Sequence, residues 1–268
     1  MASILNNIAS LTAKRNLGLS ETGLNRTLGR LSTGERINMA ADDAAGLQIS
    51  SNLRADIRIL NQARRNANDG VGRLQVAEGV MEEAVNILTR AAELAEQAAS
   101  GTTTSAGRAA LDQEFTEIKV ALNALDRDTK FDSQDIFGTT FDIRVGETTA
   151  EVITVTTVAI DSTNLTVTQD LTTSDNASLA LAQITAAIET ISSNRGALGA
   201  KQQRLGTTIN SLSITAENIQ AAESQIRDAD VADEVVNLTK YQVLQQTGVS
   251  ALAQANQSTQ AVLSLLQG

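Results

Sequence analysis

The sequence offers carboxylates for chemistry but neither imidazoles nor thiols, because its 268 residues include no His and no Cys. Ordinary zinc sites, thiol nucleophiles, Ser-His triads and disulfide bonds are therefore excluded. A pair of Asp or Glu residues could still act as acid and base. However, the acidic residues are scattered along expected helix faces, where a charge is usually solvated. We predict that the chain is not an enzyme and that it needs no cofactor and no metal.

The charge of the chain argues against nucleic acid as a partner. The formal net charge is −10, whereas proteins hold a polyanion mainly through Lys and Arg. Residues 1–65 are locally basic, with nine Lys or Arg against five acidic residues. The first aromatic residue is Phe115, so this basic segment has no ring on which bases could stack. We expect no bound nucleic acid.

Residues 241–268 contain no charged side chain, yet they are too rich in Gln, Ser, Thr and Asn to span a membrane. If this segment is a helix, its apolar residues fall close to one face: Leu238, Tyr241, Leu244, Ala251, Ala255, Val262 and Leu265. A helix of this kind gains little by folding alone. We expect it to be buried between chains or against the opposite end of its own chain.

The composition indicates long helices packed on small side chains, since the chain has no Pro, no Trp, one Tyr and four Phe. Apolar spacing predicts a first helix that is interrupted at 32–34 and a connection over 38–46. Sustained heptads then predict a second helix with Leu53 to Ala95, a third with Leu111 to Leu125, and a fourth with Leu181 to Ile226. A turn over 101–107 separates the second helix from the third.

The apolar period changes to two over about 139–170, where β-branched residues alternate with polar ones. This pattern predicts two or three antiparallel strands. The fold class that we expect is mainly α, an elongated bundle of long antiparallel helices with terminal coiled-coil helices and a small β-hairpin region. We expect three parts: terminal helices over 1–42 and 228–268, a helical bundle rod over 43–138 and 176–227, and a β-rich insert over 139–175.

No secretory signal peptide is expected at the start, because residues 1–11 carry apolar positions three and four apart instead of a continuous apolar core behind basic residues. The sequence has no stretch of about eighteen apolar residues, so no membrane span is predicted. The chain is therefore expected to be cytoplasmic or to be exported by an unusual route.

Two blocks at opposite ends of the chain resemble bacterial flagellin. The amino-terminal block contains residues 31–38 (LSTGERIN), 41–47 (ADDAAGL) and 65–70 (RNANDG). The carboxy-terminal block contains residues 224–230 (SQIRDAD), 244–246 (LQQ), 252–257 (LAQANQ) and 262–266 (VLSLL). The resemblance covers about residues 1–130 and 177–268. Only about 45 residues separate the helical blocks, so the chain resembles a short flagellin without large outer domains.

The resemblance implies a structural subunit that polymerises into the flagellar filament for swimming motility. In flagellins the terminal helices form the inner tube, are disordered in the free monomer and become ordered on assembly. The implied assembly core of this chain consists of Ile4, Ile8, Leu11, Leu24, Leu28, Leu31, Leu244, Leu252, Val262 and Leu265.

The family also implies partners and a location. The partners are copies of the chain itself, an export chaperone at the C-terminal segment, and hook-associated and filament cap proteins. The location is the extracellular filament, reached through the flagellar secretion apparatus without a cleaved signal peptide. Arg90, Leu94 and Glu114 match positions through which similar flagellins contact the vertebrate innate flagellin receptor. The alternatives to a filament subunit are a hook–filament junction protein and a cytoplasmic helical signalling hairpin.

Overall fold

The computed structural model describes residues 7–148 and 150–267, with side chains described as far as Gln257. Its main elements are five α-helices: α1 (Ile8–Thr33), α2 (Ala44–Ala99), α3 (Ser105–Asp128), α4 (Ser174–Arg227) and α5 (Val231–Gln267). Two antiparallel hairpins lie between α3 and α4 in the sequence: β1 (Lys130–Phe131) with β2 (Gln134–Asp135), and β3 (Thr140–Arg144) with β4 (Val152–Thr156). The predicted fold class, mainly α with a small β-hairpin region, is confirmed.

Short polar side chains begin most of these helices by accepting a hydrogen bond from a backbone N–H of the first turn. Asp43 does so at the start of α2, Thr104 at α3 and Asp230 at α5. At the end of α1, Gly34 takes the left-handed conformation with φ 73° and donates its N–H to the carbonyl of Arg30. The predicted interruption at 32–34 is therefore the true end of this helix.

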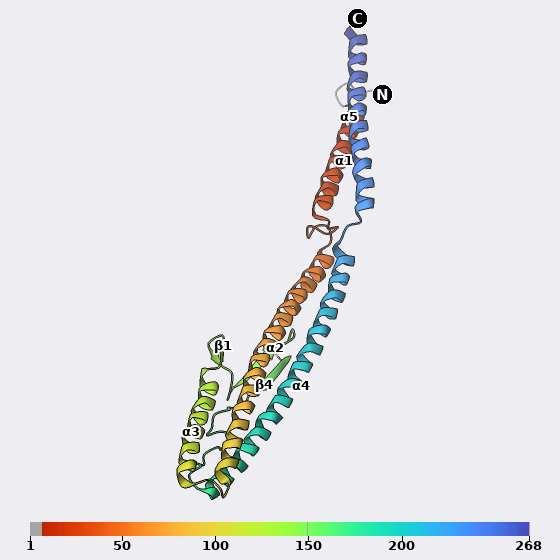
Figure 1. Cartoon of the computed structure of the whole chain (residues 1–268). Helices are drawn as coiled ribbons and strands as arrows, with labels where there is room; N and C mark the ends of the chain where they lie inside the picture. Colours follow the sequence, from red (N-terminus) through yellow and green to blue (C-terminus); the bar gives the residue numbers. More distant parts are fainter. Residues whose placement is uncertain (1–6, 149, 268) are drawn as a thin grey trace. The chain divides into compact units, whose positions relative to one another are not determined.

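The chain forms two compact units. Unit 1 contains residues 1–55 and 218–268, and unit 2 contains residues 56–217. In unit 1, α1 and α5 lie side by side and antiparallel (Figure 1). Unit 1 thus includes the first turns of α2 and the last turns of α4 as well as the terminal helices.

The core of unit 2 follows the predicted heptads of α2 and α4. Along α2, the buried residues include a row spaced by seven positions: Leu60, Ala67, Leu74, Met81, Leu88 and Ala95. Along α4, a row with the same spacing is buried: Ala177, Ile184, Ile191, Leu198 and Leu205. A second buried row on α2 consists almost entirely of alanines, from Ala63 to Ala98. Small side chains in this row explain how three helices pack with so few aromatic residues.

The β3–β4 hairpin packs its apolar face into this core. Ile143, Ile153 and Val155 are buried, while Thr140, Asp142 and Thr154 face solvent, as the predicted period of two requires. Ile143 lies on α2 where Gly70 leaves space, because a Cβ on Gly70 would lie 2.4 Å from the Ile143 Cδ1 atom.

Two strands, β3 and β4, form where two or three were expected, and the residues that follow them add no third strand. Residues 157–173 are irregular, although Ile160, Leu165 and Leu171 are buried. Backbone N–H groups here bond to side chains of α3 instead of to a neighbouring strand: Ile160 to Asp126 at 2.7 Å, Ser162 to Asn123 at 2.8 Å and Leu171 to Asp112 at 2.8 Å. The side-chain oxygens of α3 thus accept the hydrogen bonds that these backbone N–H groups would otherwise donate to a neighbouring strand.

Candidate functional site

A polar junction joins the segments of unit 1 that precede α2 and follow α4. The backbones of Glu35 and Asp228 form an isolated antiparallel bridge, with Arg36 N–H donating to the Arg227 carbonyl at 2.6 Å. Ala229 N–H donates to the carbonyl of Gly34 at 2.9 Å. These bonds hold two segments together that are almost two hundred residues apart in the sequence.

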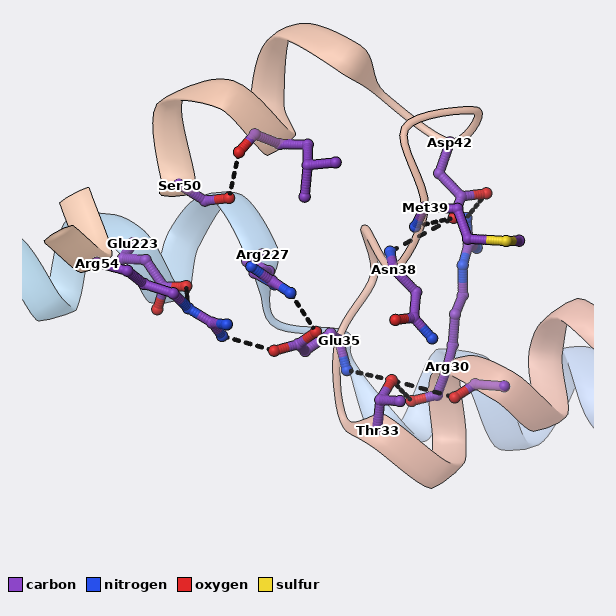
Figure 2. A network of polar contacts seen from close by, with 12 residues as sticks. Arg30, Thr33, Glu35, Asn38, Met39, Asp42, Ser50, Arg54, Glu223 and Arg227 are labelled. Atoms are coloured by element: carbon purple, nitrogen blue, oxygen red, sulfur yellow. Dashed lines mark hydrogen bonds and ion pairs between the residues drawn. The ribbon is translucent and has the colours of Figure 1, made fainter. Parts of the chain in front are cut away.

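Glu35 is the centre of the side-chain network at this junction (Figure 2). Its carboxylate accepts hydrogen bonds from Arg54 at 2.6 Å and Arg227 at 2.8 Å, and Arg54 also donates to the buried Glu223 at 2.8 Å. Desolvation alone would raise the pKa of Glu35, but the hydrogen bonds and charges of the two arginines outweigh it and lower that pKa.

A second ion pair ties α1 to the start of α5. Arg30 donates to Glu234 at 3.0 Å, and the Glu234 side chain is only 8% exposed. Asp42 lies 4.0 Å from the same guanidinium and accepts hydrogen bonds from the N–H groups of Asn38 and Met39 (Figure 2). Asp42 therefore connects the loop before α2 to the end of α1.

The facing sides of α1 and α5 carry few large apolar residues. On α1, positions three and four apart are covered, Thr27 fully and the others in part: Ser10, Ala13, Leu17, Ser20, Leu24, Thr27 and Leu31. On α5, the corresponding positions are Glu234, Leu238, Tyr241, Gln245, Gly248, Leu252 and Ala255. Near the far end of the pair, the Asn7 side chain donates to the Ala255 carbonyl at 2.9 Å.

Outward faces of the same two helices are unusually apolar. Among the side chains that the structure describes, seventeen large apolar ones are exposed, and twelve of them lie in unit 1: Ile8, Leu11, Leu19, Leu28, Met39, Ile49, Val231, Val235, Val236, Val243, Leu244 and Val249. Ile8 and Leu11 are 73% and 70% exposed. Exposed apolar residues this dense on one unit indicate a surface that other protein covers.

The predicted assembly residues divide between these two kinds of face. Leu24, Leu31 and Leu252 lie on the facing sides, whereas Ile8, Leu11 and Leu28 are exposed. Ile4 lies outside the described residues, as do the side chains of Val262 and Leu265.

The predicted stripe on α5 needs a correction. Leu244 is 42% exposed and Ala251 is also exposed, because the covered positions follow a three-four alternation through Tyr241, Gln245 and Leu252. On the side of α5 that faces α1, Gln245 is partly covered, whereas Leu244 is exposed.

The predicted receptor residues do not form one exposed site. Arg90 and Glu114 are exposed, and the Arg90 guanidinium donates to the Glu114 carboxylate at 2.8 Å and to Glu93 at 2.9 Å. Leu94, however, is 1% exposed and belongs to the core of unit 2. A side chain with no accessible surface cannot contact a partner, so Leu94 is removed from this set.

Sequence reasoning missed the fit of Tyr241 against Gly23. A Cβ on Gly23 would lie 2.5 Å from the Tyr241 ring, so the ring occupies the space that the absent side chain leaves. The only signals were the single Tyr of the chain and a glycine within a predicted helix. Glu35 and Arg227 lie in the blocks 31–38 and 224–230, but nothing in either block indicated that the two side chains would meet.

The residues that the structure describes contain neither a candidate metal site nor a candidate membrane span. No group of three or more carboxylates is placed there to hold a metal ion. None of the helices within that part of the chain is long and apolar enough to cross a membrane.

Comparison with known proteins gives a consistent result. The bacterial flagellin N-terminal helical region matches residues 4–142, and the bacterial flagellin C-terminal helical region matches residues 181–266. A flagellin of Halalkalibacterium halodurans is 39% identical over 98% of this chain and 99% of its own length. The flagellar filament 33 kDa core protein of Treponema phagedenis is 35% identical over 98% of this chain and 99% of its own length.

A solved structure agrees with this result. The crystal structure of Bacillus cereus flagellin has a TM-score of 0.50 and 25% identity, covering 59% of this chain and 94% of that chain. The two family regions together match most of the residues, and the two relatives extend over almost the whole chain. This chain therefore belongs to the bacterial flagellin family, as a short form without large outer domains.

Proposed function

We propose that this chain is a structural subunit that polymerises into the bacterial flagellar filament for swimming motility. The observation that carries the proposal is the apolar surface of unit 1, where twelve large apolar side chains are exposed on α1, α5 and the adjoining segments. Burial of one Val, Leu or Ile side chain contributes roughly 1.5–3 kcal/mol. Covering even part of this surface with other copies would strongly stabilise an assembly.

The chemistry of unit 1 suits a polymer better than an enzyme. Its exposed apolar residues occur on α1 at one end of the chain and on α5 at the other, so one copy presents two different apolar faces. Contact between two unlike faces propagates as an open helical filament when its rotation does not close into a ring. The proposed inner core consists of the terminal segments 1–42 and 228–268, with a bundle over 43–138 and 176–227 and an insert over 139–175.

The same surface supports further proposed partners. Before assembly the exposed valines of α5 would need a cover, which an export chaperone bound to the C-terminal segment would supply. Hook-associated and filament cap proteins would pair with the two ends of the filament through the same faces. The proposed route to the cell exterior is the flagellar secretion apparatus, without a cleaved signal peptide.

A vertebrate innate flagellin receptor is a second proposed partner, supported by the exposed charged cluster on α2 and α3. The Arg90 and Glu114 side chains are 54% and 47% exposed, and they present a fixed ion pair on the surface of unit 2. A receptor reporter assay should respond to the monomer and lose response with Arg90→Ala. The exposed Glu117→Ala on the same helix serves as a control. No response to the unmodified monomer would remove this partner.

Seeded assembly tests the main proposal. Purified full chain is depolymerised by heat, returned to assembly conditions with short filament seeds, and compared with a chain that lacks residues 241–268. The full chain should give filaments by electron microscopy, and the shortened chain should not. A full chain that stays a folded monomer would favour the hook–filament junction protein or the signalling hairpin.

A further inference from the structure

The facing sides of α1 and α5 repeat every seven residues and do not by themselves define one alignment. Leu17, Leu24 and Leu31 recur along α1, and Leu238 and Leu252 lie two heptads apart on α5. Sliding one helix by seven residues, about 10.5 Å, would again place leucine positions on the shared face. Some other feature must select the observed register.

Two glycines supply that feature, one on each helix. The ring of Tyr241 lies where a Cβ on Gly23 would come within 2.5 Å of it. In the opposite direction, Leu17 of α1 lies against Gly248 of α5, where a Cβ would be 3.3 Å from the Leu17 Cδ1 atom. Each helix thus has one glycine that leaves space for a large side chain of the other helix. The two α5 residues involved, Tyr241 and Gly248, are seven positions apart.

Other glycines of α1 show that this fit is local. A Cβ on Gly18 or Gly29 would meet nothing within 4 Å. These two positions could carry a side chain without disturbing the pair, whereas Gly23 could not. The close approach of the helices at Gly23 is therefore tied to the position of Tyr241.

Displacement by one heptad would break these fits and the ion pair at the base. In the observed antiparallel register, Arg30 faces Glu234, Gly23 faces Tyr241, and Leu17 faces Gly248. A shift in one direction would place Tyr241 opposite Leu17 and bring Glu234 to Gly23. A shift in the other direction would place Tyr241 opposite Arg30 and leave Glu234 without its cation, which is costly for a buried carboxylate.

We propose that the gaps at Gly23 and Gly248, filled by Tyr241 and Leu17, fix the axial register of α1 against α5. They thereby determine which alignment of the terminal helices enters the assembly. The inference rests on the proposed function, because it concerns the surface through which unit 1 is proposed to assemble. Gly23, Tyr241, Leu17 and Gly248 are positioning residues that set the relative height of the two apolar outer faces.

Cysteine pairs can test the register directly, since the chain has no Cys of its own. An ideal Cβ on Gly248 lies 3.7 Å from the Leu17 Cβ, within the range of about 3.5–4.5 Å that a disulfide needs. The double variant Leu17→Cys with Gly248→Cys should therefore form a bridge within one chain after seeded elongation. The pair Leu17→Cys with Ala255→Cys reports the one-heptad shift that places Tyr241 opposite Arg30, and it should not bridge.

The role of the gap is tested in the background of Gly23→Ala. Overpacking a close contact is unfavourable, so the rate of bridging between positions 17 and 248 should fall roughly tenfold. Gly18→Ala is the matched control and should leave this rate unchanged. Adding Tyr241→Ala to Gly23→Ala removes the clash and should restore bridging in part. This rescue distinguishes a change of register from a general loss of pairing between α1 and α5.

The outcomes are distinct from those of the assembly test. Failure of the unmodified chain to elongate seeds would overturn the proposed function whatever the bridging result. If elongation is intact, three results would each overturn the register proposal. The first is a disulfide from position 17 to position 255 instead of 248, and the second is disulfide-linked dimers instead of a bridge within one chain. The third is an equal rate of bridging in the Gly23→Ala and Gly18→Ala backgrounds.

Discussion

The guanidinium of Arg227 donates a 2.8 Å hydrogen bond to the carboxylate of Glu35, which lies 192 residues earlier in the chain. Arg54 donates to the same carboxylate, so one acidic group joins the segments before α2 and at the end of α4. The Arg227 side chain is 12% exposed, and this limited access to water strengthens the contact relative to a surface ion pair. The junction thus joins two segments that lie far apart in the sequence.

Acid should weaken this junction. The folded-state pKa of Glu35 is lowered from its ordinary value of 4.5. Its contribution to stability is therefore present above that value and is lost as pH falls through the folded-state pKa. We expect the free energy of unfolding of unit 1 to decrease below about pH 4.5, and Glu35→Gln to remove part of that dependence.

Chemical denaturation at several pH values, followed by tyrosine fluorescence, measures this effect because the single Tyr lies in unit 1. The exposed Glu21→Gln on α1 serves as the control. An unchanged pH dependence in Glu35→Gln would contradict the assignment of Glu35 as the titrating group.

Removal of Glu234 should destabilise the base of the α1–α5 pair. Its carboxylate accepts from Arg30 at 3.0 Å, and Glu234→Ala would leave that guanidinium without this partner. Because Arg30 remains partly exposed, we expect a loss of about 1–3 kcal/mol, below the cost for a fully buried pair. Hydrogen exchange of the backbone amides of residues 231–240 measures the loss, and an exchange pattern equal to that of Glu21→Ala would refute it.

Gly70 and Gly72 form a matched pair on α2. Gly70→Ala should destabilise unit 2 by roughly 1–3 kcal/mol, because its Cβ would lie 2.4 Å from the Ile143 Cδ1 atom. Gly72→Ala meets nothing within 4 Å and should stabilise the helix by up to about 1 kcal/mol. Thermal unfolding of both variants checks the prediction. The same shift in both would show that Ile143 does not pack on Gly70.

Asp126 should hold the irregular segment before α4. Burial is the main reason that the pKa of its carboxyl is raised, although it accepts a hydrogen bond from the Ile160 N–H at 2.7 Å. Asp126→Ala should destabilise unit 2 by about 1–3 kcal/mol, because that N–H loses its acceptor.

Asp126→Asn keeps an acceptor oxygen without a buried charge, so it should cost less at neutral pH. The raised pKa means that ionising Asp126 opposes folding as pH rises from the unfolded-state to the folded-state pKa. Amide exchange at Ile160 distinguishes the two variants. Equal protection in both would contradict the role of the hydrogen bond.

The sequence allowed the helices and the core of unit 2 to be predicted because their signal is local and repeated. Leu74, Met81 and Leu88 recur at seven-residue steps, and all three are buried as this spacing indicates. The short β1–β2 hairpin was missed, since two-residue strands carry no periodicity. Of the two or three strands expected over 139–170, two are formed. Near Leu165 the side chains of α3 satisfy the backbone instead, and no local pattern records this.

The facing sides of α1 and α5 were less predictable because both helices are apolar on more than one side. Ile8 and Leu11 satisfy a helical spacing as well as Leu17 and Leu24 do, yet the structure exposes the first two. Gly23 and Gly248 permit close approach at one position each, and neither contact leaves a periodic signal in the sequence. A contact between residues more than two hundred positions apart cannot be read from spacing within either helix.

A comparison of two valines tests the central claim most directly. Val243 on α5 and Val120 on α3 are 55% and 56% exposed, so Val243→Asp and Val120→Asp add the same charge at equally accessible sites in units 1 and 2. Both variants should fold with unchanged helix content by circular dichroism. Seeded elongation followed by electron microscopy should show filaments with Val120→Asp and few or none with Val243→Asp. Normal elongation by Val243→Asp would contradict the claim that the exposed apolar surface of unit 1 drives assembly.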